Sequence, residues 1–217
     1  MENIKDMLAE SGVFLRGHFV LSSMRHSDEY LQKTKIYKNP AILDDLCWEI
    51  AQEVALPFSA AKGRGIEVVV GPAMGGIILS NRVAYHLTQL YQEDVISLFT
   101  EKDEKGKQVL KRGYLTDIPG KRALIVDDVI TTGHSVREIM AEIIDNGGIP
   151  AVVAAVCNRG NVQPADFNDL TLISLLDMEM NDWKEGECPL CKKKVPIDPF
   201  LGRGAEFLAL HPEYPRK

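Results

Sequence analysis

The stretch from Lys121 to Ile139 reads KRALIVDDVITTGHSVREI and joins an apolar run, an acidic pair and a turn rich in hydroxyl groups. Ala123–Val126 contains no polar residue, which is typical of a strand buried on both faces of a sheet. Asp127 and Asp128 follow at once, although neighbouring carboxylates repel each other and resist removal from water. The arrangement therefore predicts a bound species with paired hydrogen-bond donors or with positive charge.

The turn after the acidic pair has the composition of a phosphate-binding loop. Thr131, Thr132 and Ser135 supply hydroxyl groups, and the backbone N–H groups of residues 131–135 lie where a helix is expected to begin. Unpaired amides and the positive end of a helix both favour an anion, and Gly133 lets the backbone approach closely or take a positive φ. A plain strand end with a plain turn is the alternative, but the direct succession of both features favours a site for a phosphate beside a ribose diol or a divalent cation.

Strands and helices alternate on both sides of this stretch. The expected strands are Ile66–Gly71, Val95–Phe99, Ala123–Val126, Ala151–Val156 and Leu170–Leu176, and the expected helices are 41–56, one that opens at Gly75-Gly76 and one that carries Val136, Ile139, Met140, Ile143 and Ile144. This alternation predicts an α/β fold with a mostly parallel sheet covered on both faces. A helix over residues 4–11 and short strands over 19–23 and 30–32 are expected to form a small N-terminal unit.

The composition is that of an ordinary globular protein of 217 residues, with 45% apolar and 26% charged residues. The formal charge of −6 argues against general nucleic-acid binding, which needs a basic face, but is compatible with a local basic pocket for a small anion. No apolar run approaches the roughly 20 residues that span a bilayer, and the first residues show no secretory signal. We expect a cytoplasmic protein whose four cysteines form no disulfide framework.

The segment from Glu101 to Gln108 is charged, contains a glycine and has no apolar anchor. We expect a mobile loop here, between Phe99 and a strand over Val109–Tyr114. On composition alone, a solvated hairpin tip without a function is the favoured interpretation.

Leu124–Ser135 resembles the phosphoribosyl pyrophosphate (PRPP) motif of the type I phosphoribosyltransferases. Phe19–Ser27 resembles the N-terminal segment of one family among them, the orotate phosphoribosyltransferases, and Gly71–Ile77 resembles the pyrophosphate loop of that family. The charged segment lies where the family has its mobile catalytic loop, and the Cys-Pro-Leu-Cys sequence at 188–191 is similar to one branch of it. The resemblance covers roughly residues 10–200.

The resemblance implies a type I phosphoribosyltransferase-like α/β fold, in which helices flank a mostly parallel central sheet, with a small N-terminal hood element and a mobile catalytic loop. We expect one phosphoribosyltransferase domain over residues 1–217, made of a hood segment (1–40), an α/β core (41–180) and a C-terminal extension (181–217) that contains the Cys-Pro-Leu-Cys sequence. A second domain for decarboxylation is not expected in a chain of this length.

The implied reaction, a step of pyrimidine synthesis, displaces pyrophosphate from C1 of PRPP by N1 of orotate and gives orotidine 5′-monophosphate. Its oxocarbenium-like transition state requires a site that stabilises a cationic ribose and a leaving pyrophosphate. The resemblance assigns the ribose hydroxyls to the acidic pair and the 5′-phosphate to the turn. The implied PRPP-binding residues are Asp127, Asp128, Val129, Thr131, Thr132, Gly133, His134, Ser135, Ala73, Met74, Gly75 and Arg112.

In the family, a lysine of the mobile loop reaches the pyrophosphate, often in the site of the neighbouring subunit. Lys105 is the first candidate for this catalytic role by its position after Phe99, Lys102 is the second and Arg112 is the third. We therefore expect a homodimer with the loop lysine contributed across the interface. Closure of the loop would also exclude water and limit hydrolysis of PRPP.

The remaining site assignments concern the metal and the base. Mg²⁺ bridges pyrophosphate oxygens with few direct protein ligands, so we expect it to bind mainly through PRPP, with Asp127 and Asp128 as candidate ligands. Arg159 is a candidate to pair bidentately with the carboxylate of orotate, and a surface salt bridge is the alternative. The expected orotate-binding residues are Thr131, Arg159, Ser23 and Arg25.

Four positions depart from the family pattern. Met24 stands where the family usually has glycine, and Asp28 stands where proline is common. Ser22 and Gly75 replace lysines that some members carry, as they do in one branch of the family. These departures concern the shape of the orotate pocket rather than the PRPP site.

Cys188 and Cys191 have the spacing of half a zinc site. A second pair of ligands is not visible, because the other two cysteines are isolated and the histidines show no ligand spacing. Loop packing is the favoured interpretation of the two cysteines, ahead of bound zinc and of a redox-sensitive pair. His18 and His26 are expected to be structural or exposed.

Two other functions remain open at this point. One is the same fold acting on a purine or another base, and the other is a PRPP-sensing regulator that has lost catalysis. A regulator should lack the loop lysines and carry a DNA-binding region or a basic face. The presence of Lys102 and Lys105, without a helix-turn-helix pattern, favours the enzyme.

Overall fold

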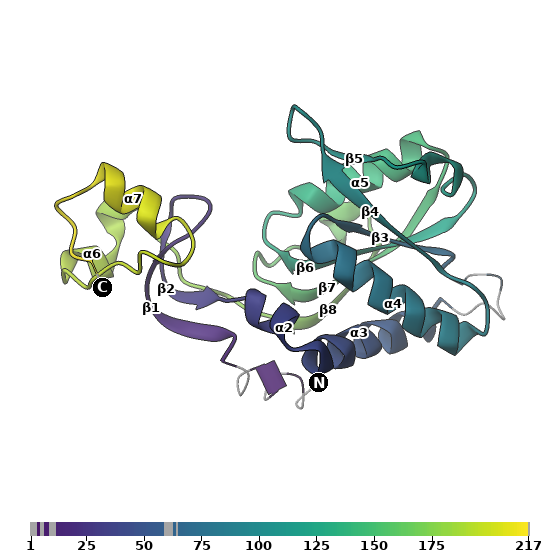
Figure 1. Cartoon of the computed structure of the whole chain (residues 1–217), viewed down its shortest axis with the longest axis horizontal. Coiled ribbons are helices and arrows are strands. Elements are labelled where there is room, and N and C mark those ends of the chain that lie inside the picture. The colour runs from purple at the N-terminus through teal and green to yellow at the C-terminus, as the bar shows by residue number, and fades with distance from the viewer. Residues whose placement is uncertain (1–3, 5–6, 9–11, 59–62, 64, 217) are drawn as a thin grey trace. The chain divides into compact units, whose positions relative to one another are not determined.

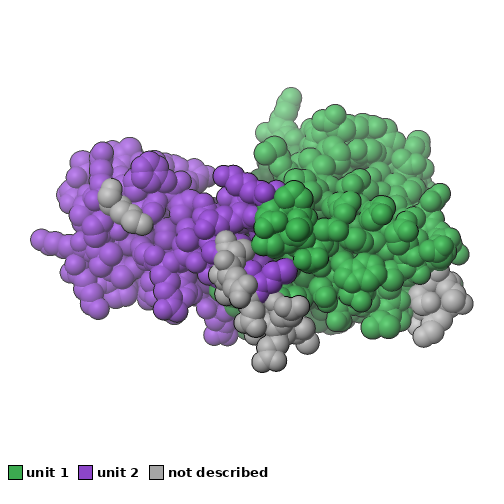
Figure 2. Space-filling model, turned by 60° about the horizontal axis from the view of Figure 1, so that its bottom comes forward, with its two compact units in different colours: residues 1–4, 39–178 green, residues 5–38, 179–217 purple. Residues whose placement is uncertain are grey.

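The computed structural model describes residues 4, 7–8, 12–58, 63 and 65–216, so the helix expected over residues 4–11 lies largely outside the described residues. The chain divides into two compact units, which Figure 2 shows in different colours. Unit 1 contains residues 1–4 and 39–178, and unit 2 contains residues 5–38 and 179–217.

Unit 1 is built around a six-stranded sheet with the strand order β5-β4-β3-β6-β7-β8. Neighbouring strands are parallel except β4 and β5, which are antiparallel. The expected α/β fold with a mostly parallel sheet is confirmed. The strands are β3 (Val68–Pro72), β4 (Ile96–Lys102), β5 (Gln108–Leu110), β6 (Arg122–Ile130), β7 (Ile149–Asn158) and β8 (Thr171–Asp177).

Three helices cover this sheet: α3 (Pro40–Ala55), α4 (Gly75–Tyr91) and α5 (His134–Asp145). Figure 1 shows α3 and α4 on one face and α5 on the other. This follows from the right-handed crossover rule, because β3–α4–β4 runs toward one edge of the sheet and β6–α5–β7 runs toward the other. The α3 helix begins where Pro40 occupies its first turn and the Asn39 side chain accepts a hydrogen bond from the N–H of Ile42.

The apolar period of α5 places its core face as expected, with one exception. Val136, Ile139 and Ile143 are buried in a cluster that also contains Val70 and Ile125 of the sheet. Ile144, which was expected on the same face, is 52% exposed because it lies at the edge of the apolar face of the helix.

The two crossovers define the place where a ligand is expected. β3 and β6 are neighbours in the sheet, and their connections leave in opposite directions. Open α/β sheets bind ligands outside the carboxyl ends of strands at such a switch point, because the two following loops separate and leave a crevice. Residues 73–75 follow β3, and residues 131–135 follow β6.

Unit 2 combines the two ends of the chain. β1 (Phe14–Val20) and β2 (His26–Leu31) form an antiparallel pair, followed by α2 (Thr34–Lys38). The C-terminal part contributes α6 (Pro189–Lys192) and α7 (Gly204–Leu210). A small apolar core joins the two parts and consists of Val20, Ile197, Phe207 and Leu208, with Tyr214 packed against it.

Three sequence expectations need correction. The strands expected over 19–23 and 30–32 are instead β1 and β2, and residues 21–25 form the turn that joins them, closed by a hydrogen bond from the N–H of Leu21 to the carbonyl of Arg25 (2.8 Å). The strand expected over Val109–Tyr114 is only β5, because Arg112 takes a positive φ and a 3-10 turn begins at Tyr114. The loop expected over 101–108 is shorter, because Lys102 pairs with Gln108.

None of the helices in the described part of the chain has the length and apolar character needed to cross a membrane.

Candidate active site at the carboxyl ends of β3 and β6

The loop after β3 is held close to the sheet. The backbone N–H of Ala73 donates to the carbonyl of Thr100 at the end of β4 (2.8 Å). A Cβ on Gly71 would lie 2.4 Å from the carbonyl oxygen of Gly76, so the end of β3 and the first turn of α4 approach so closely that both residues must be glycine. The side chain of Met74 is 83% exposed, and α4 begins at Gly75. The loop thus presents backbone at the N-terminal end of a helix, where anions bind favourably.

The acidic pair lies near the carboxyl end of β6, and Val129 and Ile130 follow it in the strand. Asp128 is 5% exposed, whereas Asp127 is half-buried and its carboxylate accepts a hydrogen bond from the backbone N–H of Asp128 (2.8 Å). Asp127 stands beside Ala155 of β7, and Val129 stands beside Cys157. Two adjacent carboxylates are therefore held on a buried strand end beside the switch point.

The turn after β6 has the geometry that its composition predicts. Gly133 has φ +69° and is the N-cap of α5, and a Cβ there would lie 2.9 Å from the ring of Phe167. The side chains of Thr131 and Ser135 are half-buried and that of Thr132 is exposed. Gly133 has no side chain to cap α5, and the amide of His134 contacts the Thr132 hydroxyl instead. The first turn of the helix can therefore offer its next amides to a bound anion.

His134 lies at the start of α5 with an exposed side chain. Its backbone N–H contacts the hydroxyl of Thr132 (3.4 Å), and its ring Nε2 lies 3.4 Å from the carboxylate of Glu138 on the next turn of the helix. The side chain of His134 is therefore directed along α5 and not toward the loop.

The loop after β7 is pressed against the phosphate-type turn. The backbone N–H of Arg159 donates to the carbonyl of Ile130 (2.8 Å). A Cβ on Gly160 would lie 1.5 Å from the carbonyl oxygen of Thr131, so only glycine fits there. Arg159 is thus brought beside the turn from a different strand. Burial raises the pKa of the neighbouring Cys157 thiol to about 12, which Arg159 opposes, so this thiol stays protonated at neutral pH.

The charged segment forms a hairpin between β4 and β5, and its tip extends beyond the rest of unit 1 in Figure 1. At its base, the buried hydroxyl of Thr100 donates to the side chain of Gln108 (2.8 Å). At its tip, the carboxylate of Asp103 accepts from the backbone N–H groups of Lys105 and Lys107 (2.8 and 2.9 Å). The hydrogen bond from the Lys107 N–H lowers the pKa of Asp103 most strongly. Lys102 and Lys105 have exposed side chains.

Arg112 belongs to the hairpin rather than to the crevice in this structure. Its Nε donates to the carboxylate of Glu101 (2.6 Å), and its guanidinium lies over the ring of Phe99, 5.6 Å from the centroid.

Ser23 and Arg25 lie on the turn between β1 and β2 in unit 2. Arg25 donates to the carboxylate and the carbonyl of Asp182 (2.7 and 3.1 Å). Met24 between them has φ +60°, a backbone conformation that glycine adopts without strain, so glycine is the residue that this position favours. Asp28, the other departure, has a buried carboxylate oxygen that lacks a hydrogen-bond partner among the described residues.

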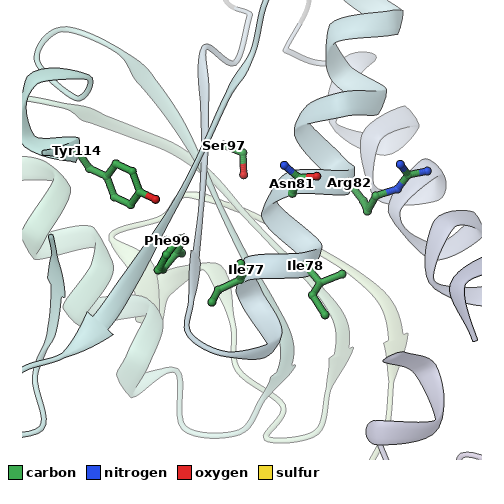
Figure 3. Close-up of a pocket in the computed structure, with 7 residues that line it drawn as sticks. All are labelled: Ile77, Ile78, Asn81, Arg82, Ser97, Phe99 and Tyr114. Carbon is green, nitrogen blue, oxygen red and sulfur yellow. The ribbon is translucent and has the colours of Figure 1, made fainter. Parts of the chain in front are cut away.

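A separate pocket of about 400 Å³ opens beside α4 and contains none of the predicted site residues. Figure 3 shows the residues that line it: Ile77, Ile78, Asn81, Arg82, Ser97, Phe99 and Tyr114. Arg82 pairs with Asp44 of α3, and this hydrogen bond lowers the pKa of that carboxyl. We regard the switch-point crevice, not this pocket, as the candidate active site, because the acidic pair and the phosphate-type turn lie there.

Sequence reasoning missed one cluster. His18 and His26 are fully buried, which agrees with the structural alternative of the prediction and not with the exposed one. They meet Cys188 and Cys191 in unit 2, so the prediction that no second pair of ligands exists is wrong. The spacing held no signal, because the histidines and the cysteines lie about 170 residues apart and meet only through the fold.

Comparison with known proteins identifies the family of the chain. Residues 32–189 match the family model described as phosphoribosyl transferase domain, which is the class that the fold and the switch-point loops define. The chain is 39% identical over 194 residues to the orotate phosphoribosyltransferase of Chlorobaculum parvum (88% of this chain, 91% of that protein) and 39% identical over 195 residues to that of Pelotomaculum thermopropionicum (90% and 94%).

Among solved structures, the orotate phosphoribosyltransferase from Aeropyrum pernix superposes with a TM-score of 0.65 at 23% identity, over 81% of this chain and 93% of that chain. The Mycobacterium tuberculosis enzyme of that name, in complex with Fe(III) dicitrate, superposes with a TM-score of 0.62 at 19% identity, over 81% and 95%. At these identities the superpositions concern the fold. The sequence relatives and the family model together show that this chain belongs to the type I phosphoribosyltransferases, in the orotate phosphoribosyltransferase family.

Proposed function

We propose that this chain transfers the 5-phosphoribosyl group of PRPP to N1 of orotate, which releases pyrophosphate and forms orotidine 5′-monophosphate for pyrimidine synthesis. The observation that carries the proposal is the acidic pair Asp127-Asp128 followed by an uncapped helix start, at the switch point of a parallel sheet. Membership of the family supports orotate as the base.

The chemistry requires the bond from C1 to the pyrophosphate oxygen to break while the bond to N1 of orotate forms. Positive charge develops on the ribose as pyrophosphate leaves. We assign the ribose hydroxyls to the carboxylates of Asp127 and Asp128, which accept hydrogen bonds and stabilise nearby positive charge. The hydroxyls and amides of residues 131–135 hold the 5′-phosphate, which positions C1 for attack.

The loop after β3, with Ala73, Met74 and Gly75, is assigned to the pyrophosphate, because the backbone amides of Met74 and Gly75 lie at the start of α4, whereas that of Ala73 donates to Thr100. Phosphoribosyltransferases generally use Mg²⁺ with PRPP. Carboxylate oxygens are ligands that Mg²⁺ accepts, so Asp127 and Asp128 fit this ion. When bound, it neutralises charge on the leaving pyrophosphate.

Orotate is assigned to Arg159, whose guanidinium suits bidentate recognition of a carboxylate, and to Thr131, Ser23 and Arg25. The close packing of the Arg159 loop against Thr131 supports the first two, because it joins the base and phosphate ends of one site. The contributions of Ser23 and Arg25 rest on the family resemblance of their segment.

We further propose a homodimer in which Lys105, with Lys102 as second candidate, reaches the pyrophosphate of the neighbouring subunit. Apolar side chains along α4 support self-association: Met74, Ile78 and Tyr85 are 83%, 41% and 51% exposed. Exposed apolar surface of this kind marks contact sites in monomers that assemble. Light scattering on the purified chain measures the assembly directly.

We propose two broader assignments. The two compact units act as one phosphoribosyltransferase domain, with residues 1–40 as hood and 181–217 as extension of the 41–180 core. The cytoplasm is the proposed location, and the absence of a disulfide among the described cysteines supports it.

The test of the activity is the loss of orotate absorbance in the presence of PRPP and Mg²⁺. The double variant Asp127→Asn, Asp128→Asn should turn over at least about 100-fold more slowly, as expected when groups that stabilise transition-state charge are lost. Asp94→Asn is the matched control, because this exposed aspartate precedes β4 at the opposite end of the sheet. Unchanged turnover in the double variant contradicts the assignment. If the chain turns over a purine base and not orotate, the proposed base is wrong and the substrate is a purine.

A further inference from the structure

Four side chains with metal-binding atoms meet inside unit 2. They are His18 of β1, His26 of β2, Cys188 at the N-cap of α6 and Cys191 within α6, and their ligand atoms all lie within 4.8 Å of one another. The two histidines and Cys188 are 0–1% exposed, and Cys191 is half-buried. The burial of four such ligand atoms costs free energy, because each polar atom has lost its contact with water. A bound metal ion would compensate for this loss.

The distances match a tetrahedral site. His18 Nε2 lies 3.6 Å from the Sγ atoms of both Cys188 and Cys191, and His26 Nδ1 lies 3.2 Å from Cys191 Sγ and 2.9 Å from His18 Nε2. Ligands of a tetrahedral zinc ion, with Zn–N of about 2.0–2.1 Å and Zn–S of about 2.3 Å, stand roughly 3.3–3.8 Å apart. The two nitrogen–sulfur contacts of His18 fall in this range, and the two shorter contacts need only a small expansion.

A hydrogen bond to the backbone orients the ring of His18 in the way that is common for metal-binding histidines. Its Nδ1 donates to the carbonyl of Val195 (2.8 Å), which leaves Nε2 unprotonated and directed at the cysteines. Such a hydrogen bond from the far ring nitrogen to a carbonyl fixes the tautomer of a metal-ligating histidine. The backbone N–H of Asp198 also donates to the carbonyl of His18 (2.9 Å), so the strand and the C-terminal segment hold the residue from both sides.

The ligand set fits one ion better than others. Two sulfur and two nitrogen ligands in a tetrahedron are typical of zinc. Two thiolates neutralise Zn²⁺, so the loaded site has no net charge and can be buried. With four protein ligands, no coordination position remains for a substrate, which is the mark of a structural site rather than a catalytic one.

The site would add to the core of unit 2. One apolar cluster of this unit contains the four buried residues Val20, Ile197, Phe207 and Leu208. Small units are commonly stabilised further by a metal. We propose that His18, His26, Cys188 and Cys191 bind one structural Zn²⁺, which joins the β1–β2 hairpin to the C-terminal extension. This inference does not depend on the substrate of the enzyme.

The first test is the metal content of the purified full-length chain, measured by inductively coupled plasma mass spectrometry. We expect about one zinc per chain in the wild type, and less than about a tenth of that in the double variant Cys188→Ser, Cys191→Ser. Cys47→Ala is the matched control, because it removes another fully buried cysteine, in α3 of unit 1, and should keep the zinc. Zinc retained by the double variant shows an adventitious ion and overturns the proposal.

A second test covers the case in which the double variant does not fold. Replacement of the native metal by Co²⁺ should give the intense visible absorption of a tetrahedral site with two thiolates. His26→Cys should keep the metal and shift this absorption, because it adds a third thiolate. The swap suits His26, since it faces the cluster with Nδ1, the ring nitrogen nearer to the backbone. A wild-type chain that takes up neither zinc nor Co²⁺ in reducing buffer overturns the proposal. Neither readout involves orotate or PRPP, so failure of the proposed activity would be seen separately.

Discussion

At the scale of single residues, the backbone conformation at Met24 and the close packing at Gly160 both limit which side chain can be present. Met24 sits in the left-handed region with φ +60°, where a Cβ is disfavoured by about 1 kcal/mol. The sequence alone marked this residue as unusual for the family. It gave no physical reason, because a positive φ cannot be recognised at a methionine.

The first prediction uses this conformation. Met24→Gly and Met24→Ala both remove the side chain beyond Cβ, but only the glycine variant also removes the Cβ that strains the positive φ. We expect Met24→Gly to be more stable than Met24→Ala by about 1 kcal/mol in chemical denaturation, because the two differ only in the Cβ. Equal stability of the two variants would show that the turn rearranges.

A second residue-scale prediction concerns Gly160. Its hydrogen faces the carbonyl of Thr131, and a Cβ would lie 1.5 Å from that oxygen. Gly160→Ala must therefore displace the Arg159 loop or the phosphate-type turn. A shift of about 1 Å at a substrate-positioning loop reduces catalysis by roughly 100-fold.

Steady-state kinetics with orotate and PRPP measures this loss in kcat/KM. Gly186→Ala is the control, because a Cβ there meets no atom within 4 Å and its φ is not positive. Gly160→Ala at wild-type kcat/KM would mean that the two loops do not form one site.

At the scale of elements, the hairpin between β4 and β5 shows a feature that sequence patterns did not predict, namely the extent of its strand pairing. The charged composition predicted a loop, and the structure keeps only residues 103–107 as the turn, because a buried hydrogen bond between Thr100 and Gln108 extends the pairing. This bond joins two buried polar residues, and a pattern of apolar residues in the sequence cannot predict that polar residues are buried.

The third prediction belongs to this hairpin. Lys105→Ala should lower kcat by at least about tenfold, if its ammonium stabilises the leaving pyrophosphate. Lys107→Ala removes an exposed lysine from the same turn and is the matched control. If Lys105→Ala and Lys107→Ala have equal and small effects, the tip contributes only general positive charge. If only Lys102→Ala lowers kcat, the catalytic role belongs to Lys102.

The central sheet was the most predictable element, because parallel strands buried on both faces appear as continuous apolar runs. Its strands end within a few residues of the expected limits. The strand expected over Ala123–Val126 continues to Ile130, so the acidic pair lies near the carboxyl end of β6 but inside the strand rather than after it. The His–Cys cluster was not predictable, since its four ligands come from two strands and a short helix at opposite ends of the chain. Only the folded association of residues 5–38 with 179–217 brings them together.

At the scale of the whole molecule, the proposed homodimer makes the strongest demand on the catalytic assignment. If Lys105 acts in the site of the partner subunit, each site draws its acidic pair from one chain and its lysine from the other. A chain with Lys105→Ala and a chain with Asp127→Asn, Asp128→Asn should then each turn over slowly alone. A mixed dimer, however, contains one site with both an intact acidic pair and an intact lysine.

The fourth prediction is therefore recovery of activity on mixing. Equal amounts of the two variants, exchanged through mild denaturant and refolded together, should give half mixed dimers with one complete site of two, or about a quarter of the wild-type rate. Each variant refolded with itself is the control. If both functions come from the same chain, a mixed dimer has no complete site and the rate stays at the level of the single variants. Recovery would thus establish the dimer and the crossing of the hairpin together, because neither alone restores turnover.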